Sequence, residues 1–195
     1  MNNTQILEKL LKDRRNTRLF KNKPIPKKLI SKIIEMGTWA PNHRMTEPWQ
    51  FVVIRKGSSE RSLISKKISK YTKMNSKNTN PESVQKSADR GAGEFEDCPL
   101  IIYVCSKKGK NSEETLENYS STSISIQNMC LYAWTKGIGV GWSTGKPTKV
   151  TNLYKILDVS KSSKIVGCLY IGYIENKSDI IKKSRKNHLE KTIWK

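Results

Sequence analysis

Two apolar runs, Leu100 to Cys105 and Ile165 to Ile174, most limit how this chain can fold. Neither run contains a charged residue, which is typical of strands that are covered on both faces. Gln50 to Ile54 and the shorter Val140 to Ser143 are predicted as two further strands. Helical spacing of apolar residues occurs at residues 3–13, 27–36 and 113–136. Interleaved helices and strands predict one α/β or α+β domain in which helices cover a mixed sheet.

The low apolar content indicates that another subunit completes the core. Hydrophobic residues make up 35% of the 195 residues, which is below the usual share for a globular chain. The helix predicted at residues 113–136 carries apolar side chains around much of its circumference, so more than one of its faces must be buried. We expect it to be a central or subunit-interface helix. The length fits a single domain, residues 1–195.

The chain is strongly basic. It has 37 Lys and Arg against 17 Asp and Glu, a formal net charge of +20. Such an excess attracts polyanions, so nucleic acid, an anionic membrane and phosphorylated small molecules are candidate partners. The lysines are scattered and no aromatic-rich basic motif accompanies them, which favours a solvated basic surface over a nucleic-acid groove.

The four cysteines lie in or beside apolar runs and form no C-x-x-C pair. This pattern favours buried, reduced thiols over a disulfide framework or a zinc site, and no metal site is predicted. The N-terminal stretch lacks the apolar core of a signal peptide, and no apolar run reaches the ~18 to 20 residues needed to cross a bilayer. A cytoplasmic location is expected.

Residues 61–97 are rich in Lys, Ser and Asn and have only a thin apolar stripe. We predict a helical, peripheral and mobile segment there. It is either a surface excursion or a lid over a pocket, and the composition favours the excursion. Residues 186–195 are predicted to form a C-terminal arm.

Two polar stretches are candidate binding sites. In Gly37 to Ile54, hydrogen-bonding side chains crowd a loop between Trp39 and Trp49, which suits a flat ligand with polar edges. A capped helix-to-strand connection has a similar pattern. Arg14 to Phe20 places three arginines and an asparagine where a helix ends, and arginine binds phosphate or carboxylate bidentately. A solvated cationic helix end, which complements the helix dipole, is slightly favoured for that stretch alone.

The glycine-rich run Gly137 to Gly145 is not a dinucleotide-binding fingerprint. It follows a helix and lacks the final x-x-G spacing. It predicts a helix C-cap, a short strand and a turn at Gly145 that lets the backbone approach a neighbour closely.

Together these stretches resemble the flavin-dependent nitroreductase family over nearly the whole chain. Arg14-Arg15-Asn16-Thr17-Arg18-Leu19-Phe20 is similar to its R-R-S-x-R-x-F motif, and Ala40-Pro41 through Pro48-Trp49-Gln50-Phe51 to its A-P-S/D-x…Q-P-W-x-F. Residues 137–145, GIGVGWSTG, resemble its G-x-G-x-x-W…G segment, and Lys183-Ser184-Arg185 its late K-x-R pair. Each motif is weak alone, but four in the right order at fitting separations are specific. The compact central loop with its histidine most resembles the small, single-domain branch of the family.

The resemblance implies an α+β fold with a mixed, mainly antiparallel sheet flanked by helices. It also implies an intertwined homodimer with FMN at the interface. The residues that it assigns to FMN fall into four groups: Arg14, Asn16, Lys183 and Arg185 at the phosphate; Arg15 or Arg18 at the pyrimidine edge; Trp39, Pro41, Asn42 and His43 lining the ring from the other subunit; and Trp142, Ser143, Thr144 and Gly145 along the ring.

The activity implied is ping-pong, two-electron hydride transfer from NAD(P)H through FMN to a nitroaromatic, quinone or similar acceptor. The chemistry occurs on FMN, so no catalytic residue is assigned to the protein. Two residues depart from the family pattern, Asn16 where Ser is usual and Glu47 where Gln is usual, and they leave FMN affinity and acceptor preference open. The alternatives are a nucleic-acid or polyanion-binding protein, and a flavin-fragmenting or dehalogenating relative on the same fold.

Overall fold

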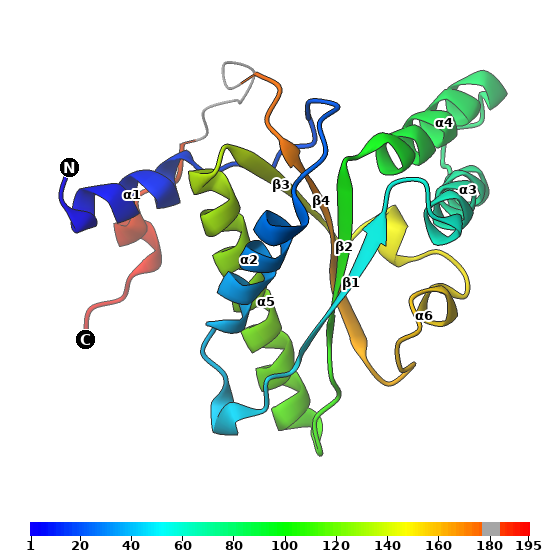
Figure 1. Cartoon of the computed structure of the whole chain (residues 1–195). Helices are drawn as coiled ribbons and strands as arrows, with labels where there is room; N and C mark the ends of the chain where they lie inside the picture. The colour runs from blue at the N-terminus through cyan, green and yellow to red at the C-terminus, as the bar shows by residue number, and fades with distance from the viewer. Residues whose placement is uncertain (177–183) are drawn as a thin grey trace.

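A four-stranded antiparallel sheet forms the centre of the molecule (Figure 1). The computed structural model describes residues 1–176 and 184–195. The strand order is β1-β2-β4-β3, where the strands are β1 (Trp49–Arg55), β2 (Leu100–Ser106), β4 (Lys164–Tyr173) and β3 (Ile138–Ser143). The two apolar runs are therefore the central strands, and every residue of β2 is buried. Burial on both faces explains why neither run alternates with polar residues.

The register confirms the predicted mixed, mainly antiparallel sheet. Trp49 lies opposite Ser106 in the β1–β2 pair, and a bulge interrupts the β2–β4 ladder between Val104 and Cys105. An isolated parallel bridge joins Asn16, which lies outside the strands, to Val140 of β3. The α+β class with flanking helices is likewise confirmed.

Two helices cover one face of the sheet, α2 (Lys27–Thr38) and α5 (Ser112–Thr135) (Figure 1). They bury Ile33, Ile126 and Met129 against the strands. Helix α1 (Asn3–Asp13) lies near the C-terminal end of α5, opens with a capping box at Asn2, and buries none of its described residues. Helix α5, which was predicted at residues 113–136, begins and ends one residue earlier than expected.

The opposite face is covered by α3 (Ser59–Met74), α4 (Pro81–Asp97), η2 (Lys146–Thr148) and α6 (Leu153–Ile156). Helices α3 and α4 confirm the helical content predicted for residues 61–97, and α4 begins where Asn80 caps its N-terminus and Pro81 occupies its first turn. Ile64, Ile68 and Phe95 are buried in a second core against this face. Residues 61–97 therefore contribute a packed layer, and their role as a lid stays a prediction.

Two short 3-10 helices complete the described elements, η1 (His43–Met45) and η4 (His188–Lys191). The arm predicted at 186–195 includes η4, and its described residues are exposed. All four cysteines are buried and free, as predicted. Across residues 1–176 and 184–195, every helix is too short or too polar to cross a membrane.

Candidate functional site

The segment Arg14 to Phe20 runs along the edge of β3. Arg14 ends α1 with an extended backbone conformation, φ −56° and ψ 136°, and its N–H donates to the Leu10 carbonyl oxygen at 3.1 Å. Isolated bridges then pair Asn16 with Val140 and Phe20 with Ile174. The end of a helix therefore delivers the arginine cluster to the edge of the sheet.

The glycines of β3 make room for this segment. A Cβ atom at Gly141 would lie 2.6 Å from the carbonyl oxygen of Thr17, and one at Gly139 would collide with the Thr17 side chain. The glycine-rich run was predicted as a helix cap, a short strand and a turn, and the packing of the distant segment Arg14 to Phe20 against it was not predicted. The spacing of two residues, which puts both glycines on one face of a strand, was the available signal.

A pocket of about 350 Å³ lies between this segment and α5, and we call it the Arg14 pocket. Its lining residues are Arg14, Asn16, Gln127, Cys130, Trp142 and Thr144. Oδ1 of Asn16 accepts the backbone N–H of Trp142 at 2.6 Å, which ties the arginine segment to the end of β3.

The buried Nε of Arg14 has no hydrogen-bond partner among the described residues. A buried polar atom without a partner is rare, because its desolvation cost is not repaid. A guanidinium donor in this state fits a pocket that receives an anion. The donors present therefore suit a phosphate group.

A second pocket of about 350 Å³ lies on the α3 and α4 side of the sheet, and we call it the Arg18 pocket. Arg18, Ser143 and Gly145 from the predicted set line it, together with Ile68, Ser87, Arg90, Gly91, Glu94, Lys146, Pro147 and Tyr170. The Arg18 guanidinium lies 4.3 Å from the Tyr170 ring centroid and donates to Glu94 at 3.1 Å. Burial raises the pKa of the Tyr170 hydroxyl, so the ring is neutral at physiological pH.

The residues of α4 in this pocket were not identified from the sequence. Arg90 and Glu94 lie in the segment that composition assigned to a surface excursion. Their contact with the Arg18 pocket depends on how α4 packs across the sheet, and no local motif marks it.

The remaining predicted contacts, Trp39, Pro41, Asn42 and His43, lie in the loop after α2. Trp39 is 76% exposed. Asn42 accepts the backbone N–H of Glu47 at 2.9 Å, and the backbone has positive φ at Arg44 and Met45. This loop is held in a strained conformation by hydrogen bonds of its own.

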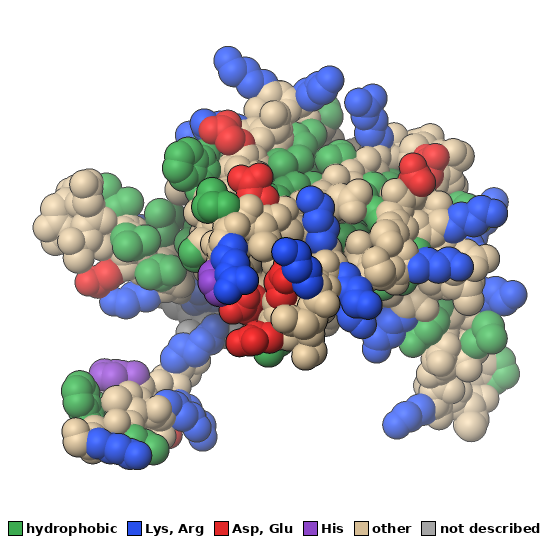
Figure 2. Space-filling view, turned by 90° about the horizontal axis from the view of Figure 1, so that it is seen from below, with side chains coloured by type: hydrophobic (Ala, Val, Ile, Leu, Met, Phe, Trp, Pro, Cys, Tyr) green, Lys and Arg blue, Asp and Glu red, His purple; other side chains and the backbone are tan. Residues whose placement is uncertain are grey.

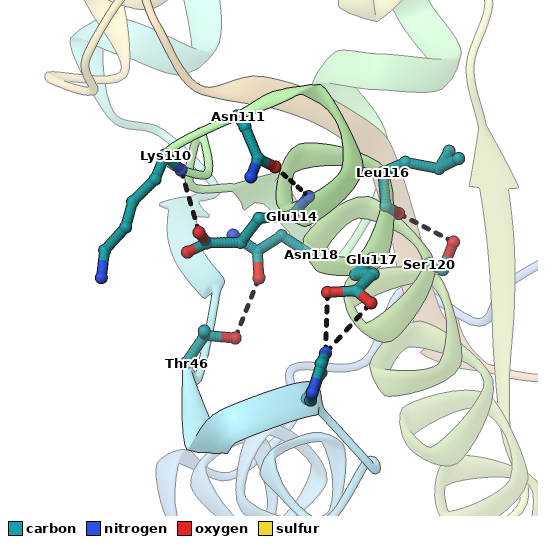
Figure 3. A network of polar contacts seen from close by, with 9 residues as sticks. Thr46, Lys110, Asn111, Glu114, Leu116, Glu117, Asn118 and Ser120 are labelled. Atoms are coloured by element: carbon teal, nitrogen blue, oxygen red, sulfur yellow. Dashed lines mark hydrogen bonds and ion pairs between the residues drawn. The ribbon is translucent and has the colours of Figure 1, made fainter.

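His43 is anchored to the beginning of α5. Nδ1 of His43 lies 3.0 Å from both carboxylate oxygens of Glu117, and Thr46 donates to Asn118 at 2.9 Å (Figure 3). A pocket of about 300 Å³ adjoins these contacts and is lined by His43, Arg44, Thr46, Lys110, Asn111, Glu113, Glu114 and Glu117. Figure 2, viewed from below, shows acidic side chains gathered beside basic ones on this side of the molecule.

Within one chain, the loop and the Arg14 pocket do not meet. Glu117 contacts His43, whereas Gln127 lines the Arg14 pocket ten residues further along α5. Ten residues of α-helix span about 15 Å. Figure 1 shows the loop and η1 at the lower end of α5, and α1 and β3 towards its upper end.

Two predicted phosphate or flavin contacts, Arg15 and Arg185, lie elsewhere. Nη1 of Arg15 donates to the carbonyl oxygens of Lys12 and Arg14, so it satisfies the end of α1 and lines neither arginine pocket. Arg185 is exposed and donates to the Ser184 carbonyl oxygen at 3.4 Å, and it does not line the Arg14 pocket. Lys183 lies outside the described residues.

Comparison with known proteins decides the family. The family model described as "Nitroreductase family" matches residues 11–173, which include both arginine pockets and the loop. The chain belongs to the nitroreductase family. The resemblance inferred from four short motifs is thereby confirmed.

Relatives of this nitroreductase-family chain match it over nearly its whole length. A Bacillus subtilis (strain 168) protein, YfhC, which is named as an NAD(P)H nitroreductase, is 26% identical over 92% of this chain and 90% of its own. The crystal structure of a nitroreductase-like family protein from Bacillus cereus has a TM-score of 0.81 at 25% identity, covering 100% of this chain and 97% of that one.

A third protein shares the fold at lower identity. It is the FMN-dependent nitroreductase NfnB from Mycobacterium smegmatis, solved in complex with NADPH. Its TM-score is 0.78 at 15% identity, with 100% of both chains covered.

Proposed function

We propose that this nitroreductase-family chain is an FMN-dependent NAD(P)H oxidoreductase. The observation that carries the proposal is the buried Nε of Arg14, which has no hydrogen-bond partner among the described residues and belongs to a pocket whose walls include Asn16, Trp142 and Thr144. All four residues belong to motifs by which the chain resembles flavin-dependent nitroreductases. The FMN named for NfnB and the NAD(P)H named for YfhC support the choice of cofactor and donor.

The Arg14 pocket would hold the FMN phosphate. Arg14 supplies charge and a donor that has no partner among residues 1–176 and 184–195, and Asn16 supplies its amide. Because Oδ1 of Asn16 already accepts from Trp142, its Nδ2 group is the part that would donate to a phosphate oxygen. An asparagine can therefore replace the usual serine without losing the donor. Lys183 and Arg185 remain the proposed cationic partners from the C-terminal side.

The Arg18 pocket would hold the pyrimidine edge of the flavin. Arg18 brings positive charge to this edge, and Ser143 and Gly145 place the end of β3 along the ring. Positive charge there stabilises negative charge that develops on the cofactor during reduction. Arg15 is the weaker of the two arginine assignments, since it is bonded to the end of α1.

A second copy of the chain would complete the site. Leu116, Tyr119 and Ile124 on α5 are 67%, 37% and 42% exposed, although the same helix buries its opposite face in the core. A partner covering this apolar face would bring its own loop, Trp39 to His43, towards the first subunit's α5. This arrangement would unite the two groups of residues that one chain keeps about 15 Å apart.

When bound, FMN would take a hydride from NAD(P)H and pass two electrons to an acceptor such as a nitroaromatic or a quinone. The chain would bind the cofactor, orient the ring against β3, and hold cations at its phosphate and its pyrimidine edge. No side chain is required as a proton donor or nucleophile.

The test is FMN retention by Arg14→Ala, with Arg55→Ala as the matched control at the exposed end of β1. The wild type should be yellow and should bleach with NADPH in the absence of oxygen. A charge-assisted hydrogen bond contributes about 1.5 to 3 kcal/mol, so R14A should bind FMN about 10- to 140-fold more weakly. R55A should bind FMN like the wild type. A colourless wild type that binds no added FMN would overturn the proposal, and equal FMN affinity in R14A would remove Arg14 from the phosphate site.

A further inference from the structure

The Arg18 pocket contains an acid as well as cations. Nη1 of Arg18 donates to Oε2 of Glu94 at 3.1 Å, and the side chains of Arg18 and Glu94 are 34% and 42% exposed. Glu94 belongs to α4 and is 76 residues from Arg18 in the sequence. The ion pair is thus a tertiary contact between the helical layer and the arginine segment.

The ion pair and the tyrosine fix where Arg18 points. The guanidinium lies 4.3 Å from the Tyr170 ring centroid while Glu94 accepts from its Nη1. A planar group held on a ring face by one contact and at its edge by another loses much of its rotamer freedom. Arg18 is therefore preorganised before any ligand enters the pocket.

Glu94 also sets the local charge. Among the described residues that line the Arg18 pocket, it is the single acid, beside Arg18, Arg90 and Lys146. Neither Arg90 nor Lys146 forms an ion pair with another described residue. Removing the negative charge of Glu94 would leave the pocket with three uncompensated cations.

We propose that Glu94 is a positioning residue that sets the reduction potential of the bound flavin through Arg18. The inference rests on the proposed function, which puts the pyrimidine edge of FMN in this pocket. Reduction adds negative charge to the flavin, so a cation nearby favours the reduced form and a carboxylate beside that cation opposes it. Glu94 orients Arg18 towards the ring and at the same time moderates its charge, which keeps the potential lower than three bare cations would.

The experiment measures the two-electron midpoint potential of bound FMN by equilibration with a reference dye, in wild type and in Glu94→Gln. Glutamine keeps the size of the side chain and removes its charge. We expect E94Q to bind reduced FMN about tenfold more tightly, relative to oxidised FMN, than the wild type does. A tenfold change corresponds to a midpoint potential about 30 mV more positive for a two-electron couple.

The matched control is Glu82→Gln, which removes the same charge from the first turn of the same helix. Glu82 is exposed, pairs with Lys86 and lies outside the Arg18 pocket. The midpoint potential of FMN bound to E82Q should equal that of FMN bound to the wild type. If E94Q and E82Q both retain the wild-type potential, the role of Glu94 is overturned while the proposed function stands.

The route through Arg18 is tested by the double variant. In an Arg18→Gln background, E94Q should shift the potential by less than half as much as it does alone, because the partner is missing. An undiminished shift would show that Glu94 acts directly on the flavin and would overturn the positioning role. A wild-type protein that binds no FMN at all would instead overturn the proposed function and this inference together.

Discussion

Both carboxylate oxygens of Glu117 lie 3.0 Å from Nδ1 of His43 (Figure 3). An ionised carboxylate only accepts hydrogen bonds, so this geometry requires the proton on Nδ1. The Nε2 atom of the neutral ring then carries a lone pair and can accept a hydrogen bond. If His43 lines the flavin of the partner subunit, as proposed, its Nε2 would be available there as a hydrogen-bond acceptor.

The tautomer can be measured directly by long-range ¹H–¹⁵N NMR. The chain has two histidines, so the signals of His43 and His188 can be assigned by substituting either one. At a pH where both rings are neutral, His43 should be the Nδ1–H tautomer. Glu117→Ala should return it to the Nε2–H form that a free histidine side chain prefers, while the signals of His188 stay unchanged. A His43 ring whose ¹⁵N shifts are identical in wild type and E117A would contradict this assignment.

The packing of the arginine segment on β3 predicts a large effect from one methyl group. A Cβ at Gly141 would lie 2.6 Å from a backbone oxygen of Thr17, so Gly141→Ala must push the segment away from the strand. That shift separates Asn16 from Trp142 and displaces Arg14. We expect G141A to lose about 1 to 3 kcal/mol of unfolding free energy, as overpacked variants do, and to bind FMN at least about tenfold more weakly.

The control for this variant is Gly93→Ala in α4. A Cβ there meets its nearest neighbour at 3.9 Å, an ordinary contact. Alanine in a helix interior is favoured over glycine by up to about 1 kcal/mol, so G93A should be as stable as the wild type or more so in urea unfolding. If G141A were as stable as G93A, the close approach of the two segments would be wrong.

The sequence was sufficient to predict what depends on local pattern. The apolar runs identify the central strands because strands covered on both faces have no polar side, and four motifs identify the family. The position of α5 was predicted to within one residue at each end, since Asn111 caps it and its apolar residues extend through Ala133.

What could not be predicted depends on tertiary packing. The polar composition of residues 61–97 gives no sign that α4 packs against the sheet. Only two residues of α4, Ala88 and Phe95, are buried, and they suffice to hold the helix there. Arg90 and Glu94 reach the Arg18 pocket only through that placement. For Arg15 the motif suggested a flavin contact, but the motif could not show that Nη1 of this residue donates to the end of its own helix.

Arg61 is a buried cation that links α3 to the sheet and to α4. It is 0% exposed and donates to the carbonyl oxygens of Ile54, Glu96 and Cys98. Arg61→Met fills the space but leaves three carbonyl groups without a donor, at about 1 to 3 kcal/mol for each buried group. We expect R61M to lose at least about 3 kcal/mol in urea unfolding at a fixed protein concentration. Lys70→Met, at an exposed position on the same helix, should change stability by less than about 0.5 kcal/mol. An R61M variant as stable as K70M would show that the arginine is not needed to hold the two helices.

The buried thiols predict a loss of stability in alkaline solution. Burial raises the pKa of the Cys105 thiol from 9.0 to about 11. The unfolded chain therefore releases this proton at a lower pH than the native protein does, so the thiol's contribution to stability is fully present below pH 9 and is lost as the pH rises to about 11. At 1.36 kcal/mol for each unit of pKa difference, the loss is about 2 to 3 kcal/mol.

The measurement is the unfolding free energy in urea at several pH values between about 9 and 11, for the wild type and for Cys105→Ala. C105A starts from a lower stability because a buried side chain is shortened, but its free energy should fall less steeply with pH. Parallel curves for the two proteins would mean that the Cys105 thiol is not the group that the native fold keeps protonated.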